Sequence, residues 1–203
     1  MTEVHPIEAE SYRILRSRID LSALPPLTRA VTERIIHATA DFDYVTDLVC
    51  DEAALRRGVS ALRRDAPVIA DVGMVASGIT GYPVICKIGD TLSARLARTA
   101  NITLSAAAVR LAHGEAGPGA IWLVGCAPTA LAEIMTRRVE PALVVGVPVG
   151  FVGAAAAKDE LRASGLPSLS NVSEKGGSAV AVAAFNALLR VARDQSETSD
   201  DDS

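Results

Sequence analysis

One stretch, Ala120 to Val147, decides the fold because its parts have the character of a strand, a helix and a strand in turn. Ala120-Ile-Trp-Leu-Val-Gly125 and Ala142-Leu-Val-Val-Gly-Val147 are short aliphatic runs, and a helical segment from Pro128 to Val139 separates them. Aliphatic runs without polar alternation are typical of parallel strands that are covered on both faces. A helix between two such strands predicts the β-α-β unit of a parallel sheet.

The same alternation extends over the rest of the chain. Further strands are predicted at 67–71, 82–88 and, more weakly, 166–172. Helices are predicted at 6–20, 27–38, 51–64, 92–113 with a break near Asn101, 154–164 and 177–192, with Pro6 opening the first and Asp51 as an N-cap. The sequence therefore predicts a single α/β domain over 1–193, a doubly wound sheet of about five mainly parallel strands with helices on both faces.

Composition and charge limit the classes of function. Hydrophobic residues make up 49% of the 203 residues but aromatic residues only 3%, so the core must consist of Ala, Val, Ile and Leu. The net charge of −4 comes from the end of the chain, because residues 194–203 hold five of the 24 acidic residues and leave 19 against 20 basic ones. We expect 194–203 to be an acidic disordered tail. The near-neutral remainder predicts no nucleic-acid partner.

The cysteines and the apolar segments predict a cytoplasmic protein. Cys50, Cys86 and Cys126 are odd in number and lack metal-ligand spacing. Cys86 and Cys126 stand in aliphatic runs, which predicts buried free thiols and a reducing compartment. The first residues carry no signal-peptide pattern, and no apolar stretch approaches the length of a membrane span, so no membrane partner is expected.

His37, in Arg34-Ile-Ile-His-Ala-Thr-Ala-Asp41, is the candidate for proton-transfer chemistry. It lies off the apolar stripe of Leu27, Val31 and Ile35, so it is not an ordinary core position of its helix. It also lies near the helix C-terminus, where the dipole favours a protonated imidazole, a competent general acid at neutral pH. From position alone, a surface histidine that caps a helix fits as well.

Other candidate residues surround the predicted carboxyl ends of the strands, where doubly wound sheets bind ligands. Those ends are rich in glycine, and Lys175-Gly176-Gly177-Ser178 follows a strand and opens a helix, an arrangement that suits an anion such as a carboxylate. Simple turn chemistry explains the same residues equally well. Arg110 on an alanine-rich helix and Ser11 on the first helix are weaker candidates. No dinucleotide-binding or Walker pattern is present, which argues against nucleotide phosphates here.

Five segments together resemble one family, the precorrin-8X methylmutases of corrin (vitamin B12) biosynthesis. They are His5-Pro-Ile-Glu-Ala-Glu-Ser-Tyr-Arg-Ile14, Arg34 to Asp41, Asp71-Val-Gly-Met-Val-Ala-Ser-Gly-Ile79, Gly146-Val-Pro-Val-Gly-Phe-Val-Gly153 and Lys175 to Ser178. The resemblance covers nearly all of residues 5–192. The segment around His37 and the Gly-Phe-Val turn are its most specific parts.

The resemblance implies a flavodoxin-like fold and a homodimer with the substrate site near the interface. The implied reaction moves a methyl group from C11 to C12 of a tetrapyrrole-derived ring and gives hydrogenobyrinic acid, with no organic cofactor or metal. By resemblance, His37 matches the catalytic histidine, Ser11 a substrate-contacting serine and Arg110 an arginine near the histidine. A 1,5-sigmatropic shift assisted by protonation needs one acid and no nucleophile, and the sequence offers one good acid and no catalytic triad.

The chain departs from the family pattern at two places. Ser173-Glu174 stand where the family usually has Gly-Arg before the Lys-Gly-Gly-Ser turn, and Ala156-Ala157 stand where it often has Glu-Ser before the lysine. Both changes affect expected substrate contacts. Three alternatives stay open at this point: a methylmutase for the cobalt-containing substrate, a corrin-binding carrier without catalysis, and a flavodoxin-like flavin or nucleotide binder.

Overall fold

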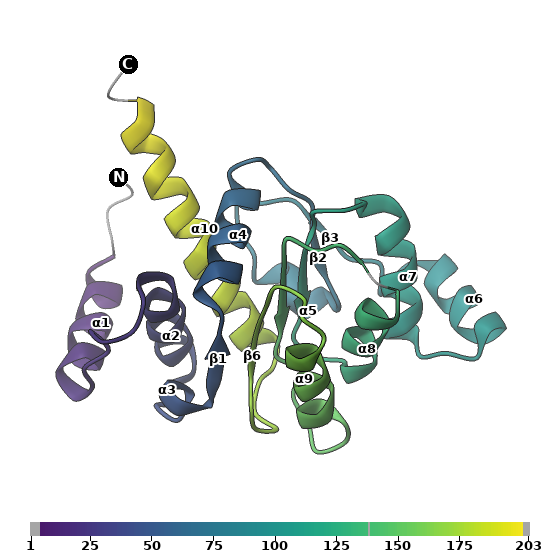
Figure 1. Cartoon of the computed structure of the whole chain (residues 1–203), viewed down its shortest axis with the longest axis horizontal. Helices are drawn as coiled ribbons and strands as arrows, with labels where there is room; N and C mark the ends of the chain where they lie inside the picture. The colour runs from purple at the N-terminus through teal and green to yellow at the C-terminus, as the bar shows by residue number, and fades with distance from the viewer. Residues whose placement is uncertain (1–4, 138, 201–203) are drawn as a thin grey trace.

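A six-stranded sheet forms the centre of the protein (Figure 1). The computed structural model describes residues 5–137 and 139–200, with the backbone alone for 195–200. The strands are β1 (Leu48–Cys50), β2 (Val68–Ala70), β3 (Val84–Ile85), β4 (Ile121–Val124), β5 (Leu143–Gly146) and β6 (Ser168–Asn171). Their order in the sheet is β1-β6-β5-β4-β2-β3. Among these described strands, only the β1–β6 pair is antiparallel.

The five strands predicted from the sequence are all present and parallel. Their order, β3-β2-β4-β5-β6, is that of flavodoxin-like folds, in which the second strand lies outside the first. The prediction missed β1, a three-residue strand at the sheet edge. Leu48-Val49-Cys50 is too short to give a pattern, and it is a strand because Leu48 pairs with Asn171 and Cys50 with Leu169.

Ten helices are described in residues 5–137 and 139–200. They are α1 (Pro6–Arg18), α2 (Pro26–Thr39), α3 (Tyr44–Asp47), α4 (Glu52–Leu62), α5 (Gly73–Ser77), α6 (Thr91–Ala100), α7 (Leu104–Ala116), α8 (Pro128–Thr136), α9 (Ala154–Ala163) and α10 (Ser178–Asp200). The predicted break at Asn101 is confirmed, because that residue has φ +50° and ends α6. Asp51 caps α4 as predicted by accepting a hydrogen bond from the N–H of Ala53.

Helices cover both faces of the sheet, as predicted. α2, α4 and α10 pack over one face, around buried Leu55, Val59 and Phe185. α7, α8 and α9 pack over the other, around buried Trp122, Leu131 and Leu161. α1 does not reach the sheet and lies against α2 as an outer layer (Figure 1). The buried residues are mainly Ala, Val, Ile and Leu, as the composition requires.

The C-terminal helix is longer than the sequence suggests. The prediction ends it at Ala192 and begins a disordered tail at Asp194, whereas α10 runs to Asp200. Arg190 Nε lies 3.9 Å from Asp194 Oδ2, one turn further along, and such pairs help to continue a helix. The rest of the predicted tail, 201–203, lies outside the described residues.

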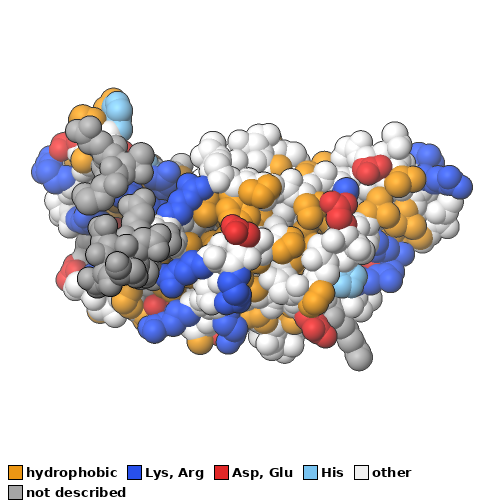
Figure 2. All heavy atoms as spheres, turned by 90° about the horizontal axis from the view of Figure 1, so that it is seen from above, with side chains coloured by type: hydrophobic (Ala, Val, Ile, Leu, Met, Phe, Trp, Pro, Cys, Tyr) orange, Lys and Arg blue, Asp and Glu red, His pale blue; other side chains and the backbone are white. Residues whose placement is uncertain are grey.

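The predicted burial of one cysteine is wrong. Cys126 is exposed, because the chain leaves β4 at Val124 and Cys126 already belongs to the loop at the sheet edge. Cys50 and Cys86 are half-buried, and all three thiols are free. Figure 2 shows the molecule from above, where hydrophobic side chains lie between basic and acidic ones.

The antiparallel strand β1 determines where the first helices lie. Leu48, where β1 begins, pairs with Asn171, where β6 ends. The start of β1 is therefore at the carboxyl edge of the parallel strands, and α3 and the end of α2 lie there too. This is the edge at which doubly wound sheets bind ligands, so the fold brings His37 to it.

Candidate active site

His37 is held by a hydrogen bond from the first helix. It lies in the last turn of α2 and is half-buried. Its Nδ1 is 2.8 Å from the hydroxyl oxygen of Ser11 on α1. A hydroxyl can donate to this nitrogen or accept from it, so Ser11 fixes the ring in either protonation state. Of the predicted site residues, these two are brought together directly.

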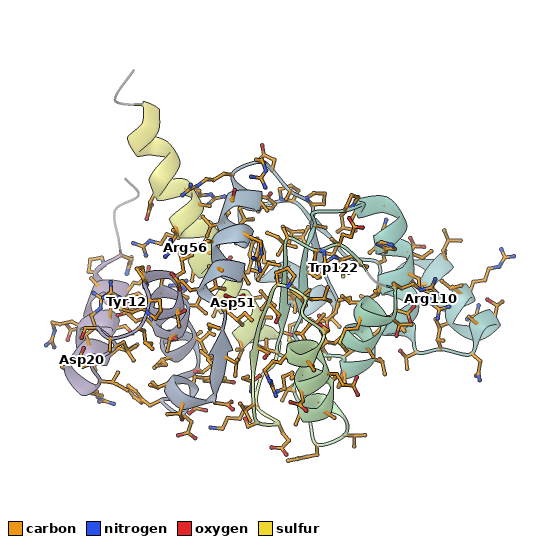
Figure 3. The ribbon with its side chains drawn as sticks, in the orientation of Figure 1. Tyr12, Asp20, Asp51, Arg56, Arg110 and Trp122 are labelled. Atoms are coloured by element: carbon orange, nitrogen blue, oxygen red, sulfur yellow. The ribbon has the colours of Figure 1, made fainter. Side chains whose placement is uncertain are left out.

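The ring of Tyr12 covers one face of the imidazole. The two ring centroids are 4.9 Å apart and the planes differ by 9°, which is a stacked arrangement. The hydroxyl of Tyr12 lies 3.4 Å from Nη1 of Arg34, and Arg34 forms an ion pair of 2.7 Å with Glu8. Figure 3 shows Tyr12 on α1 at the end of the molecule formed by α1 and α2. One nitrogen and one face of the imidazole are therefore already occupied by α1.

Two contacts determine the position of α1: one buried apolar side chain and one ion pair to α2. Leu15 is its buried residue, and Arg16 extends to Glu33 on α2 with two hydrogen bonds of 3.0 and 2.8 Å. A bidentate guanidinium–carboxylate pair fixes both distance and direction between two helices. The side chains one turn earlier on α1, Ser11 and Tyr12, are thereby aimed at His37.

At the sheet's switch point, between the carboxyl ends of β2 and β4, the protein places a carboxylate of its own. Asp71, which follows β2, accepts hydrogen bonds from the N–H groups of Gly125, Cys126 and Ala127 at 3.2, 2.8 and 3.0 Å. Burial raises the pKa of Asp71, although these donors favour its ionised form. In flavodoxin-like proteins the ligand binds at this point, and a carboxylate that already takes up these N–H groups argues against a flavin or nucleotide phosphate here.

The turn Lys175-Gly176-Gly177-Ser178 lies at the same edge, between β6 and α10. The ammonium of Lys175 binds two carboxylates in the loop that follows α2, Asp41 at 2.7 Å and Asp43 at 2.5 Å. Hydrogen bonds to these carboxylates raise the pKa of Lys175 well above its usual value. Its charge is thus shared with Asp41, four residues after His37, and the turn is tied to the histidine's own segment.

The two glycines of this turn are required by the backbone. Gly176 has φ +145°, and a Cβ there would lie 2.2 Å from the carbonyl oxygen of Val147. Gly177 has φ +117° and donates its N–H to that same oxygen at 2.9 Å. The turn therefore packs directly against the loop after β5. Ser178 begins α10, as predicted, so the N–H groups of the first helical turn follow this turn at once.

Arg110 lies far from the residues described above, on the helix α7. Its guanidinium on α7 binds Glu133 on α8, at 2.6 Å from Nε and 3.4 Å from Nη2. Arg137 also binds Glu133, at 2.8 Å, so two cations share one carboxylate. Glu133 lines an open groove of about 460 Å³ beside α7 and α8. Figure 3 shows Arg110 and Tyr12 at opposite ends of the molecule, so the structure does not bring Arg110 to His37 within one chain.

Three large apolar side chains stand in solvent at the carboxyl edge. Phe151 is 96% exposed and Val152 91%, both in the loop after β5, and Met74 is 75% exposed on α5 after β2. Phe151 and Val152 are adjacent, and a contiguous exposed apolar patch marks a surface that a partner or a ligand can cover. The sequence suggested only that this edge was small and glycine-rich.

Sequence reasoning missed several contributors to this site. Tyr12 stacks on His37, which is 25 positions away in the chain. The sequence around Tyr12, next to Ser11 on the same helix, gives no sign of this contact. Asp71 and Lys158 looked like a strand end and a helix residue, although the first binds three backbone N–H groups and the second is fully buried. An acid directly after a buried strand was the one available signal, for Asp71.

Residues 5–137 and 139–200 contain neither a grouped metal site nor a membrane-spanning helix. Within that part of the chain, no three His, Cys, Asp or Glu side chains are grouped so that they could hold a metal ion. None of the helices there combines the length and the apolar character needed to cross a bilayer.

Known proteins resemble this chain over almost its whole length. The family model described as precorrin-8X methylmutase matches residues 6–191. A cobalt-precorrin-8 methylmutase of Salmonella typhimurium is 40% identical, covering 90% of this chain and 93% of that protein. A precorrin-8X methylmutase of Pseudomonas aeruginosa is 36% identical, covering 90% and 93%. A solved structure of a precorrin-8X methyl mutase from Thermus thermophilus superposes with a TM-score of 0.85 at 35% identity, covering 93% and 96%.

Proposed function

The chain belongs to the precorrin-8X methylmutase family, and from this we propose that it moves the methyl group of precorrin-8X from C11 to C12 to give hydrogenobyrinic acid, with His37 as the proton donor. The observation that carries the role of His37 is its contact with Ser11. The hydroxyl occupies Nδ1, so Nε2 is the nitrogen left to meet the substrate. A protonated imidazole carries a proton on both nitrogens and can donate at each.

The chemistry needs little beyond that proton. Protonation of a ring imine nitrogen changes the tautomer of the macrocycle, after which the bond from C11 to the methyl carbon breaks as the bond from C12 forms. The double bonds of the conjugated system shift in the same step. Electrons are therefore only rearranged within the macrocycle, nothing is oxidised and no group leaves. Substrate and product are isomers, and the macrocycle therefore returns one proton to His37 for each one it receives. A positioned general acid contributes about 10² to 10⁴ in rate to such a step.

We propose that the substrate's carboxylates are held by Arg110 and by the turn Lys175, Gly176, Gly177 and Ser178, while Ser11, expected from the resemblance as a substrate contact, holds His37 instead. The first-turn N–H groups of α10 and a guanidinium suit carboxylates. Glu174 adds an acid beside this turn where the family usually has a base, so we assign the anion contact to the backbone N–H groups rather than to residue 174. Lys175 contributes its positive charge to the turn while its ammonium stays paired with Asp41 and Asp43.

We also propose a homodimer in which each site uses Arg110 of one subunit and His37 of the other. Two observations support it: Arg110 and Tyr12 lie at opposite ends of the molecule, and Met74, Phe151 and Val152 are exposed. The three free thiols fit a reducing cytoplasm, where we place the reaction.

Mixing two inactive variants tests the shared site. We expect His37→Ala and Arg110→Ala each to be inactive as homodimers, while coexpression restores about a quarter of the wild-type activity, since half of the dimers then contain one intact site of two. Sites built within single subunits would give no recovery. Sedimentation or light scattering of the wild type would report the oligomeric state directly, and a monomer would rule out this part of the proposal.

The central experiment supplies the substrate itself. Purified protein with precorrin-8X should give the absorbance change of hydrogenobyrinic acid, and His37→Ala should lose turnover while still binding the product. His113→Ala is the matched control, because that histidine lies in the last turn of α7 and should leave turnover unchanged. A folded wild type that leaves precorrin-8X unchanged refutes the proposal, and normal turnover by His37→Ala refutes the role of the histidine. Binding without turnover by the wild type would indicate a carrier.

The metal content of the substrate needs its own comparison. The relatives at 40% and 36% identity carry the cobalt and the metal-free names respectively, so identity does not separate the two substrates. We propose the metal-free compound and expect a higher kcat/KM for it than for cobalt-precorrin-8. A higher value for the cobalt compound would reverse the assignment without changing the roles of the residues.

A further inference from the structure

Lys158 is a fully buried cation that the reaction does not use. It lies on α9, and its side chain has 0% exposure. The ammonium donates to Asn171 Oδ1 at 2.9 Å, to the carbonyl oxygen of Lys175 at 2.8 Å and to the carbonyl oxygen of Ser173. All three of its protons therefore have an acceptor, and two of the acceptors are backbone atoms of the turn that leads into α10.

Burying the ammonium of Lys158 costs hydration free energy, so this lysine is a poor way to stabilise the fold. Burial lowers the pKa of Lys158 to about 8, although the charges of Asp47 and Glu174 favour the ammonium and only that of Arg162 opposes it. Among the described residues, no carboxylate bonds to the ammonium directly. An apolar side chain of similar size would fill such a position with less loss of hydration. The presence of a lysine here is therefore better explained by the backbone conformation of residues 173–175, which its hydrogen bonds fix, than by a gain in stability.

The conformation that it holds is that of residues 173–175. Asn171, the side-chain acceptor of Lys158, donates its Nδ2 to Asp47 at 2.8 Å and to the carbonyl of Lys175 at 2.9 Å. Asp47 in turn accepts from the N–H of Ser173 at 2.7 Å and from its hydroxyl at 2.8 Å. Lys158 and Asn171 thus hold the carbonyls of the turn inward, and Asp47 holds the N–H and the hydroxyl of Ser173.

We propose that Lys158 is the positioning residue of the substrate-binding turn, which by fixing the carbonyl groups of Ser173 and Lys175 aims the N–H groups at the start of α10 toward a carboxylate of the macrocycle. This rests on the proposed function of that turn. Lys158 itself is buried under the loop and touches no substrate. Its removal should therefore weaken binding without affecting proton transfer at His37.

The test compares Lys158→Met with Lys87→Met, a lysine that follows the outermost strand β3, which three strands separate from β6, and that pairs with Glu115. We expect Lys158→Met to raise KM, and the Kd of hydrogenobyrinic acid, about tenfold, with kcat at saturation within about twofold of wild type. Hydrogen-exchange protection of the amides at 176–179 should fall about tenfold. Lys87→Met should change none of these values.

Several outcomes would overturn the proposal. Unchanged protection and unchanged Kd in Lys158→Met exclude a positioning role, and an equal fall in kcat and kcat/KM indicates a role in the chemical step. If the wild type binds no hydrogenobyrinic acid, the proposed function fails, yet the exchange measurement still reports whether Lys158 holds the turn. If Lys158→Met does not fold, Ser173→Ala removes a smaller part of the same network, and an unchanged Kd in that variant refutes the proposal.

Discussion

The hydroxyl oxygen of Ser11 lies 2.8 Å from Nδ1 of His37, although 26 positions separate the two residues in the chain. The contact joins α1 to the last turn of α2, and the stacked ring of Tyr12 lies beside it. α1 contributes nothing to the sheet or to its main core beyond Leu15. We infer that the first helix is present chiefly to hold the histidine.

Ser11→Ala should therefore impair catalysis more than binding. Without the hydroxyl, the imidazole can rotate and Nε2 loses its fixed direction, so we expect kcat to fall about tenfold or more with a change in KM of less than about threefold. Steady-state turnover of precorrin-8X measures both values. Ser17→Ala is the control on the same helix, because its hydroxyl bonds only to the carbonyl of Ile14. A larger effect on KM than on kcat would mean that Ser11 contacts the substrate instead.

Tyr12 should act through its ring and not through its hydroxyl. Tyr12→Phe keeps the flat face against His37 and loses only a long contact of 3.4 Å with Arg34, so kcat should stay within about twofold of wild type. Tyr12→Leu removes the flat face and should lower kcat about tenfold. The two variants are compared under saturating substrate, with circular dichroism as the check on folding. Equal loss in both would assign the effect to the hydroxyl.

Gly176→Ala should destabilise the fold as well as the site. A methyl group would meet the carbonyl oxygen of Val147 at 2.2 Å, and φ +145° is strained for any L side chain. We expect a loss of about 2–4 kcal/mol in the free energy of unfolding, measured in denaturant. Gly114→Ala is the opposite case, because it stands inside α7 with nothing near its Cβ, and should gain up to about 1 kcal/mol. A neutral Gly176→Ala would mean that the turn relaxes freely.

The stability of the protein should carry a signature of Lys158 at alkaline pH. Its pKa is lowered to about 8 in the folded protein, against an ordinary value of 10.5. Between these values the unfolded chain binds the proton and the folded chain does not, so the contribution to the free energy of unfolding rises with pH. Below about 8 both states are charged, and the cost of burial applies in full.

The comparison with Lys158→Met isolates this group. The wild type should gain stability relative to the variant as pH rises above about 8, by no more than about 1.4 kcal/mol per pH unit. Taking the difference removes groups common to both proteins, among them Cys50, whose pKa burial raises to about 12. If the difference in the free energy of unfolding between the two proteins stayed constant or fell as pH rises, the lowered pKa of a buried Lys158 would be contradicted.

The sequence by itself determined the class of fold and the family. Short aliphatic runs separated by helical segments specify parallel strands covered on both faces, because the backbone periodicity and the burial of such runs are local properties. The strands after residue 67, the cap at Asp51 and the break near Asn101 are visible in this way. Motifs spread over most of the chain identified the methylmutase family.

Only the tertiary structure decided how the site is assembled. β1 is a strand because β6 pairs with it, and that pairing brings the end of α2 to the carboxyl edge of the sheet. Asp71 fills the switch point, Lys158 is buried beneath the turn at 173–175, and Arg110 lies far from His37 because α7 and α8 hold it. These relationships join residues distant in sequence, and their energies depend on desolvation and direction in three dimensions, which no pattern along one chain records.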